Sequence, residues 1–255
     1  MQNGYAPVNG LDLYYEIHGQ GKPVVLIHGG GSTIQTSFGY LLPLMAAHYQ
    51  VIAVEMQAHG HTKDRDTPES FKQDADDIAA LLRYLSIEKA DIVGFSNGGQ
   101  TALQLGISHP QVVNKLVIIS AFYKRAGTIA GFFDGFPDAT LKDMPALYHE
   151  EYLKINNDPA GLQRMFEQDK NRMMRFTDWS DEEIASIQAP ALIIAGDQDI
   201  VTPEHAAEIA RQIRNAKLLI MPGTHGSFIG EMFAKVPGSK IPEATFIVID
   251  EFLRS

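Results

Sequence analysis

The chain has 255 residues, a net charge of −10 and a hydrophobic content of 45%. A chain of this length can bury one large core, and α/β domains of this size are usually single. The acidic balance argues against a nucleic-acid surface, which needs clustered Lys and Arg. The absence of cysteine excludes disulfides, a thiolate nucleophile and a Cys-based metal site.

Targeting and membrane signals are absent from the sequence. No apolar run approaches the roughly 18 residues of a membrane span, and residues 1–5 carry neither a basic nor an apolar leader pattern. We therefore expect a cytoplasmic protein without membrane or nucleic-acid partners, either a monomer or a homodimer.

Strand and helix patterns alternate along the chain, which predicts a mostly parallel sheet covered on both faces. The first two strands are predicted to form a hairpin at Asn9-Gly10. The predicted strands are 5–8, 11–18, 24–28, 51–54, 91–95, 116–120, 191–195 and 217–221. The predicted helices are 37–48, 70–85, 97–109, 203–214 and 242–254. The fold class is α/β, with an eight-stranded sheet.

Residues 122–186 interrupt this alternation, because they contain no predicted sheet strand but many aromatic residues and methionines. We expect a helical cap, inserted after the sixth strand over the carboxyl ends of the strands, where open α/β sheets bind ligands. The alternative is a long crossover beside the sheet. The predicted core is residues 1–121 and 187–255.

The most informative motif is the pentapeptide at residues 94–98, Gly-Phe-Ser-Asn-Gly, which lies between a buried strand and a helix. A serine at this corner is held in a strained conformation that lifts its hydroxyl above the sheet. Glycines are needed on both sides because other side chains would strike neighbouring backbone. Ser96 is therefore predicted to be a nucleophile.

A serine nucleophile needs a base, and the base needs an orienting acid. His225 is the predicted base, since it follows the last strand in a glycine-rich loop at the same sheet edge as Ser96. The loop after strand 191–195 contains Asp197 and Asp199. Asp199 is the predicted acid, because Asp197 directly follows a glycine and is better placed to cap the turn.

An acyl-transfer site also needs donors for the oxyanion. The Asn97 N–H at the start of the helix is one predicted donor. The loop His28-Gly29-Gly30-Gly31 after strand 24–28 supplies the other. Gly30 is the predicted donor residue, and Gly31 is the next candidate for that role and a predicted substrate-binding residue. His28 is interpreted as a structural residue that holds the loop.

These motifs resemble the α/β-hydrolase fold family, in its capped branch of bacterial esterases, haloperoxidase-like enzymes and meta-cleavage-product hydrolases. The resemblance covers nearly the whole chain except the cap. It rests on residues 24–31, 94–98, 196–203 and 222–226, which occur in the family's order. The resemblance implies a Ser, Asp, His order of site residues, and it implies that the acid is Asp199.

One segment departs from the family pattern. Residues 55–62 read Glu-Met-Gln-Ala-His-Gly-His-Thr, where the family usually has Asp-x-Arg or Pro before Gly-His-Gly-x-Ser. His59 and His61 suggest a metal pair only weakly, and a polar loop is the preferred interpretation. Serine at position 96 replaces the aspartate of dehalogenases and epoxide hydrolases, which removes those reactions by the family's usual route.

The cap composition predicts an apolar, adaptable pocket, because some of its aromatic residues and methionines should face the substrate. Trp179 is the predicted substrate contact within it. Lys170, Arg172 and Arg175 are interpreted as solvated helix charges, with a contact to an acidic substrate as the alternative.

The predicted function is a carboxylesterase-type serine hydrolase that cleaves a small to medium ester through an acyl-enzyme, without cofactor or metal. The same residues could instead serve a carbon–carbon bond hydrolase, a lactonase or a perhydrolase. A different class, a ligand receptor that hydrolyses slowly, would show very low turnover. A dinucleotide-binding protein is disfavoured because the first loop lacks Gly-x-Gly-x-x-Gly in the required context.

Overall fold

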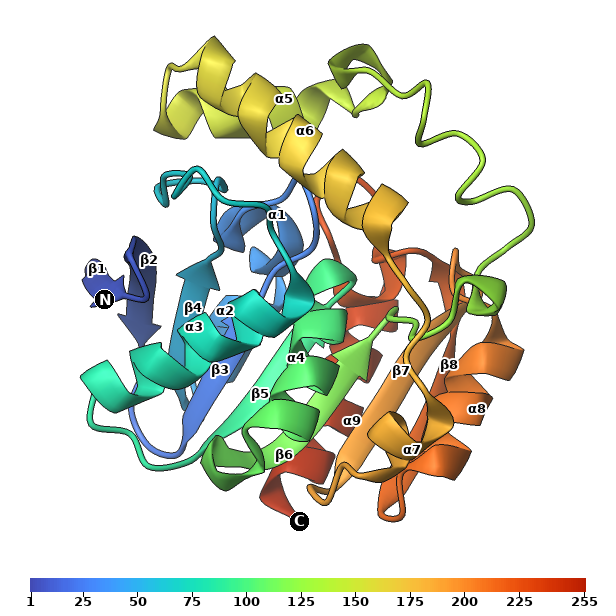
Figure 1. The fold of residues 1–255 in the computed structure, drawn as a ribbon. Coiled ribbons are helices and arrows are strands. Elements are labelled where there is room, and N and C mark those ends of the chain that lie inside the picture. Colours follow the sequence, from blue (N-terminus) through green and yellow to red (C-terminus); the bar gives the residue numbers. More distant parts are fainter.

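An eight-stranded twisted sheet runs through the centre of the computed structural model, which describes residues 1–255 (Figure 1). The strand order is β1-β2-β4-β3-β5-β6-β7-β8. The first two pairs, β1 with β2 and β2 with β4, are antiparallel, and all the others are parallel. The strands are β1 (Gln2–Val8), β2 (Leu11–His18), β3 (Pro23–Ile27), β4 (Gln50–Glu55), β5 (Ala90–Phe95), β6 (Val113–Ile119), β7 (Ala191–Gln198) and β8 (Ala216–Thr224). The predicted eight-stranded, mostly parallel sheet is confirmed.

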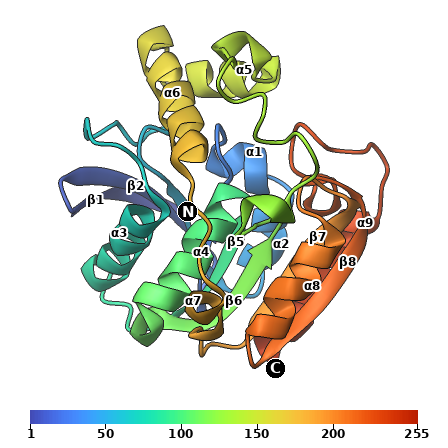
Figure 2. The ribbon, with the colours of Figure 1, turned by 45° about the vertical axis from the view of Figure 1, so that its right-hand side comes forward.

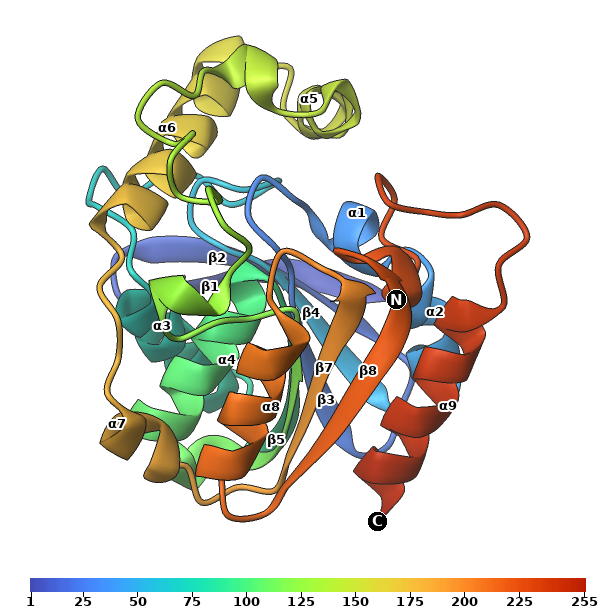
Figure 3. The same cartoon turned by 90° about the vertical axis from the view of Figure 1, so that its right-hand side faces the viewer.

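Helices cover both faces of this sheet, as predicted (Figure 3). One face carries α3 (Phe71–Tyr84), α4 (Asn97–Ser108) and α8 (Pro203–Gln212). The other carries α1 (Ile34–Phe38), α2 (Leu41–Ala46) and α9 (Ile241–Arg254). Each face buries its own apolar cluster, and the central parallel strands contribute to both. None of the helices has both the length and the apolar character needed to span a bilayer.

The first hairpin and the segment after β3 differ in how well the sequence predicted them. The hairpin at Asn9-Gly10 is confirmed, and both residues have positive φ, as a tight two-residue turn requires. The single helix predicted near 37–48 is wrong, because the structure has two short helices, α1 and α2. Pro43 explains the break: its ring would clash with the carbonyl of residue 39 in a continuous helix, and it has no N–H to donate.

The long segment between β6 and β7 has two parts. Helices α5 (Ala146–Ile155) and α6 (Pro159–Arg175) lie over the carboxyl ends of the parallel strands (Figures 1 and 2). The short helix α7 (Asp181–Ala185) instead packs beside α4 and α8, on the flank of the sheet. The predicted cap range 122–186 thus contains both a covering part and a part that joins the core.

Candidate active site

Ser96 lies at the corner between β5 and α4, with φ of 53° and ψ of −123°. A non-glycine residue with positive φ is strained by about 1–3 kcal/mol and persists only where its surroundings impose it. Here the packing imposes it, because β5, the start of α4 and the end of β3 approach so closely that only glycine fits on either side of Ser96. A Cβ on Gly94 would strike the Gly98 carbonyl oxygen, and one on Gly98 would strike that of Ile27.

The structure brings Ser96 together with His225 and Asp199, which come from three different loops at the carboxyl edge of the sheet. Nε2 of His225 lies 3.1 Å from Oγ of Ser96. Nδ1 of His225 lies 2.7 Å from Oδ1 of Asp199. The Phe95 ring packs against the imidazole at a centroid distance of 4.9 Å and limits its rotation. The two hydrogen bonds of His225 thus connect Ser96 to Asp199 in one hydrogen-bonded chain of side chains.

Asp199 is buried and held by several donors in addition to His225. Its Oδ1 accepts the Ile200 N–H at 2.7 Å, and its Oδ2 accepts the Ser120 hydroxyl at 2.5 Å. Burial by itself would raise the pKa of the Asp199 carboxyl, but the hydrogen bonds from His225 and Ser120 hold it below its usual value. The carboxylate thus stays ionised beside the imidazole.

The neighbouring acid, Asp197, has a different task. Its carboxylate is exposed and accepts the Gly223 N–H at 2.8 Å, which ties the end of β7 to β8. The expectation that Asp197 caps its own turn is wrong, because the N–H groups of Gly196 and Ile200 in that turn bond to Asp199 instead. Asp199 alone contacts His225.

The loop after β3 is held by His28. Burial lowers the pKa of His28 to about 3, so its ring is neutral. Nδ1–H donates to the Gly29 carbonyl at 2.7 Å, while Nε2 accepts the Met56 N–H at 3.0 Å. Because C=O and N–H point in opposite directions across a trans peptide, holding the Gly29 carbonyl aims the Gly30 N–H away from His28. Gly30 lines the cavity above Ser96.

Asp169, on cap helix α6, contacts both the glycine loop and the Ser96 corner. Its Oδ2 accepts the Gly31 N–H at 2.6 Å, and its Oδ1 accepts Nδ2 of Asn97 at 3.0 Å. Gly31 lines a cavity beside Ser96, but its N–H is already used by Asp169. That Gly31 binds substrate stays a prediction. Sequence reasoning missed Asp169, because no local pattern links a cap residue to these loops.

A buried cluster of charges lies behind Asp169. The Arg172 guanidinium contacts Asp169 at 2.5 Å, Asp74 at 2.6 Å and Glu69 at 2.9 Å. The interpretation of Arg172 as a solvated helix charge is therefore wrong. Arg172 follows Asp169 by three residues and therefore points to the same face of α6. There its guanidinium meets the carboxyl groups of Glu69 and Asp74. Lys170 is half-buried and Arg175 is exposed.

His59 belongs to this cluster. Its Nε2 lies 3.0 Å from Oδ2 of Asp169, and its Nδ1 lies 2.7 Å from the Gln57 carbonyl oxygen. Burial alone would lower the pKa of His59, but the Asp169 carboxylate raises it to about 9. The ring is therefore protonated at neutral pH and donates both bonds. His61 binds a different carboxylate, that of Glu55, at 2.7 Å.

Two cavities meet at Ser96, both lined by Gly30, Phe132 and Tyr148. One has a volume of about 590 Å³ and extends toward His225 and Glu231. The other has a volume of about 430 Å³ and extends beneath the cap toward Met144, Phe166 and Asp169. We call them the His225 arm and the cap arm. Their linings combine aromatic side chains with a few polar groups, an arrangement that suits a small ligand with an apolar part.

Glu231 gives the His225 arm a buried carboxylate, which sequence reasoning missed. It accepts the Tyr148 hydroxyl and the Ala234 N–H, both at 2.8 Å, and forms no ion pair with Lys or Arg. In the cap arm, the Lys170 ammonium donates to the carbonyls of Pro137 and Ala139 at 2.9 and 2.7 Å. Neither arm therefore presents an unengaged cation.

Trp179, the predicted substrate contact, does not line either arm. It packs against Phe71 and Phe176, with ring centroids 6.1 and 5.8 Å away, and its backbone N–H donates to the Tyr123 carbonyl. Placing Trp179 in the pocket was wrong because the chain has already left the cap at this point and returns along the flank of the sheet. Its aromatic contacts join α3 to the end of α6.

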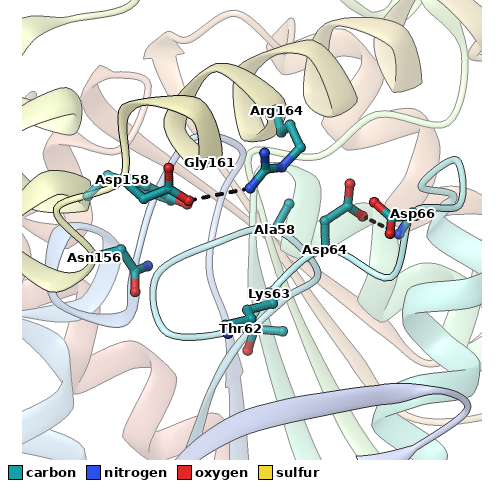
Figure 4. Close-up of a pocket in the computed structure, with 10 residues that line it drawn as sticks. Ala58, Thr62, Lys63, Asp64, Asp66, Asn156, Asp158, Gly161 and Arg164 are labelled. Atoms are coloured by element: carbon teal, nitrogen blue, oxygen red, sulfur yellow. Dashed lines mark hydrogen bonds and ion pairs between the residues drawn. The ribbon is translucent and has the colours of Figure 1, made fainter.

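A further cleft of about 530 Å³ lies between the 58–66 loop and the amino-terminal part of α6 (Figure 4). Its lining is mainly polar, and Arg164 pairs with Asp158 at its rim at 3.4 Å. None of its lining residues lines the arms at Ser96. It therefore does not contribute to the candidate active site.

The sheet order, the strained Ser96 corner and the covering helices define a hydrolase of the α/β class. A family model described as alpha/beta hydrolase fold matches residues 22–155. The chain belongs to the α/β-hydrolase fold family, as the sequence motifs indicated.

The chain is similar to proteins that are named as different kinds of hydrolase. The chain is 31% identical over 237 residues to the human protein named serine hydrolase BPHL, covering 86% of this chain and 78% of that protein. It is 27% identical to a putative carbamate hydrolase RutD of Azorhizobium caulinodans, covering 84% and 88%. A meta-cleavage product hydrolase of Pseudomonas fluorescens superposes with a TM-score of 0.79 at 23% identity, covering 98% of each chain, which shows the shared fold.

Proposed function

We propose that this protein is a serine hydrolase that cleaves a small to medium carboxylic ester through an acyl-enzyme intermediate. The observation that carries the proposal is the hydrogen-bonded chain from Ser96 through His225 to the buried Asp199. A hydroxyl is a weak nucleophile unless a base accepts its proton, and the base acts best when a carboxylate fixes its tautomer. This arrangement supplies both.

In the proposed reaction, Oγ of Ser96 attacks the ester carbonyl while Nε2 of His225 accepts its proton. Asp199 stabilises the imidazolium through Nδ1–H. The alcohol then leaves with the proton from His225, which gives the acyl-enzyme. Water attacks the acyl carbon with His225 as base, and Ser96 regains its proton as the carboxylic acid is released. No cofactor or metal takes part in these steps.

The developing oxyanion is proposed to bind the N–H groups of Gly30 and Asn97. The Asn97 N–H is at the first residue of α4, where backbone N–H groups lack intrahelical partners and the helix dipole favours negative charge. The Gly30 N–H is turned away from His28 by the fixed Gly29 peptide. Loss of one such donor typically costs about 3–4 kcal/mol of transition-state stabilisation.

The charges of the two arms favour neutral substrates over anionic ones. Glu231 has no cationic partner in the His225 arm, and Lys170 and Arg172 are both engaged elsewhere. An anionic substrate would therefore lose hydration without gaining a cationic contact. This supports an ester over the acidic vinylogous diketones that a carbon–carbon bond hydrolase would cleave.

The test compares hydrolysis of p-nitrophenyl acetate and butyrate by the wild type and by Ser96→Ala. The exposed Ser186→Ala serves as a matched control. We expect Ser96→Ala to lower kcat by about 10⁴-fold or more, with Ser186→Ala unchanged. A lactone and a vinylogous diketone acid, measured in parallel, should react more slowly. Equal ester rates for Ser96→Ala and the wild type would refute the nucleophile assignment.

A further inference from the structure

The Asp169 carboxylate bridges the glycine loop and the amino end of α4, which carry the proposed oxyanion donors, although it belongs to the cap. It binds Gly31, next to the donor Gly30, and it binds the side chain of the donor residue Asn97. A Cβ on Gly30 would strike the Asn97 side chain and come within 3.1 Å of the Asp169 carboxylate, so the three residues pack in direct contact.

All the hydrogen-bonding capacity of this carboxylate is used inside the protein. A carboxylate has about four acceptor sites. Oδ2 accepts from Gly31 and His59 at 2.6 and 3.0 Å, and Oδ1 accepts from Asn97 and Arg172 at 3.0 and 2.5 Å. No acceptor site is left for a substrate. Its place in the lining of the cap arm therefore indicates a role that acts through other residues.

We propose that Asp169 is a positioning residue that fixes the distance and orientation between the two oxyanion donors, Gly30 and Asn97. The inference rests on the proposed function, since it concerns the hole in which the oxyanion would bind. Gly31 has φ of 66°, in a glycine loop with many accessible conformations. The bond to Asp169 selects one of them, and the second bond ties that loop to the amino end of α4.

The charge cluster makes such a bridge compatible with oxyanion binding. An isolated carboxylate beside the hole would oppose the developing negative charge. Here the protonated His59 and the Arg172 guanidinium both contact Asp169 and compensate its charge. The pKa of the Asp169 carboxyl, which burial alone would raise, is held well below its usual range by His59 and Arg172, so the bridge is ionised at neutral pH.

The test variant is Asp169→Asn, which keeps the size of the side chain but turns an amide NH₂ toward two of the four donors. Glu167→Gln is the matched control, an exposed acid-to-amide change two residues away on α6. We expect Asp169→Asn to lower kcat for p-nitrophenyl butyrate by about 30- to 100-fold with KM within about threefold of the wild type, and Glu167→Gln to change neither.

Active sites are counted with a p-nitrophenyl phosphonate ester, which releases one p-nitrophenol for each Ser96 that it modifies. A loss of kcat per titrated site separates mispositioned donors from partial unfolding, which lowers the number of sites instead. If Asp169→Asn fails to fold, Asn97→Ala tests the same bridge, because it removes Nδ2 and keeps the backbone N–H. We expect about a tenfold lower kcat per site for Asn97→Ala.

The outcomes separate the inference from the proposed function. Wild-type protein that neither hydrolyses the ester nor reacts at Ser96 would overturn both. If the wild type is reactive and a folded Asp169→Asn variant keeps its kcat per site, the positioning role alone is overturned. If Asp169→Asn does not fold, an unchanged kcat per site for Asn97→Ala overturns it in the same way. A selective loss of kcat in the variant that folds supports it.

Discussion

Ser120 donates its hydroxyl to Oδ2 of Asp199 over 2.5 Å, on the side of the carboxylate that does not face His225. Ser120 follows β6 with φ of 53°, the same value as Ser96 after β5. Two adjacent parallel strands thus end in strained serines. One presents its hydroxyl to the cavity, and the other presents its hydroxyl to the acid that orients the base.

Removing the Ser120 hydroxyl tests this support. Ser120→Ala keeps a Cβ at the strained position but leaves Oδ2 of Asp199 with only the Gly196 N–H at 3.1 Å. We expect kcat for p-nitrophenyl butyrate to fall about tenfold, because Asp199 holds the imidazole less firmly. Ser108→Ala, on α4 away from the site, is the control. A kcat equal to that of the wild type would show that Asp199 needs no such support.

The two acids of the loop after β7 should behave differently. Asp199→Asn removes the acceptor for Nδ1–H of His225, and we expect a decrease in kcat of about 10⁴-fold. Asp197→Asn weakens only the exposed contact to the Gly223 N–H, and we expect a stability loss of about 1 kcal/mol with kcat nearly unchanged. Kinetics and urea unfolding of both variants check this, and the reverse pattern would exchange their roles.

Glu231 should control which substrate charge the His225 arm accepts. Replacement by Gln keeps the acceptor for the Tyr148 hydroxyl and removes the negative charge. We expect Glu231→Gln to raise kcat/KM for an ester with a terminal carboxylate about tenfold relative to its neutral analogue. Glu204→Gln, an exposed change on α8 at a residue that does not line the arm, serves as a control. If the ratio does not change, Glu231 does not influence the preference for neutral over anionic substrates.

The buried cluster behind Asp169 should make stability depend on pH. His59 faces the carboxyl groups of Asp169, Glu69 and Asp74 and the ring of His28. The pKa of His59 is raised to about 9, and burial, only partly offset by the Arg172 guanidinium, raises the pKa of the Glu69 carboxyl. Both groups therefore hold a proton in the folded state that the unfolded chain has released.

Because unfolding then releases protons, the free energy of unfolding should decrease as the pH rises toward 9. The slope is about 1.4 kcal/mol per pH unit for each group that titrates. Urea unfolding between about pH 6.5 and 9.5 measures it. Glu69→Gln should make the decrease shallower, whereas Glu88→Gln, an exposed change in the connection between α3 and β5, should not. Stability that rises over this range would contradict the assignment of buried protons.

Local patterns were sufficient for the sheet, because strand and turn propensities act over a few residues. The run at 91–95, the glycines around Ser96 and the Asn9-Gly10 turn each predict their own conformation, and the order of the motifs implies that Ser96, Asp199 and His225 reach one edge. Parallel strands connected by helices leave little freedom in where their carboxyl ends meet.

Contacts between distant segments were decided only by the tertiary structure. Asp169 meets Gly31 across 138 residues, and Arg172 meets Asp74 across 98. The local sequence around a charged residue on an amphipathic helix is the same whether its side chain contacts water or a buried partner. For this reason the sequence wrongly predicted a solvated Arg172. Trp179 was misplaced for a related reason: hydrophobicity predicts that a side chain is covered but not which surface covers it.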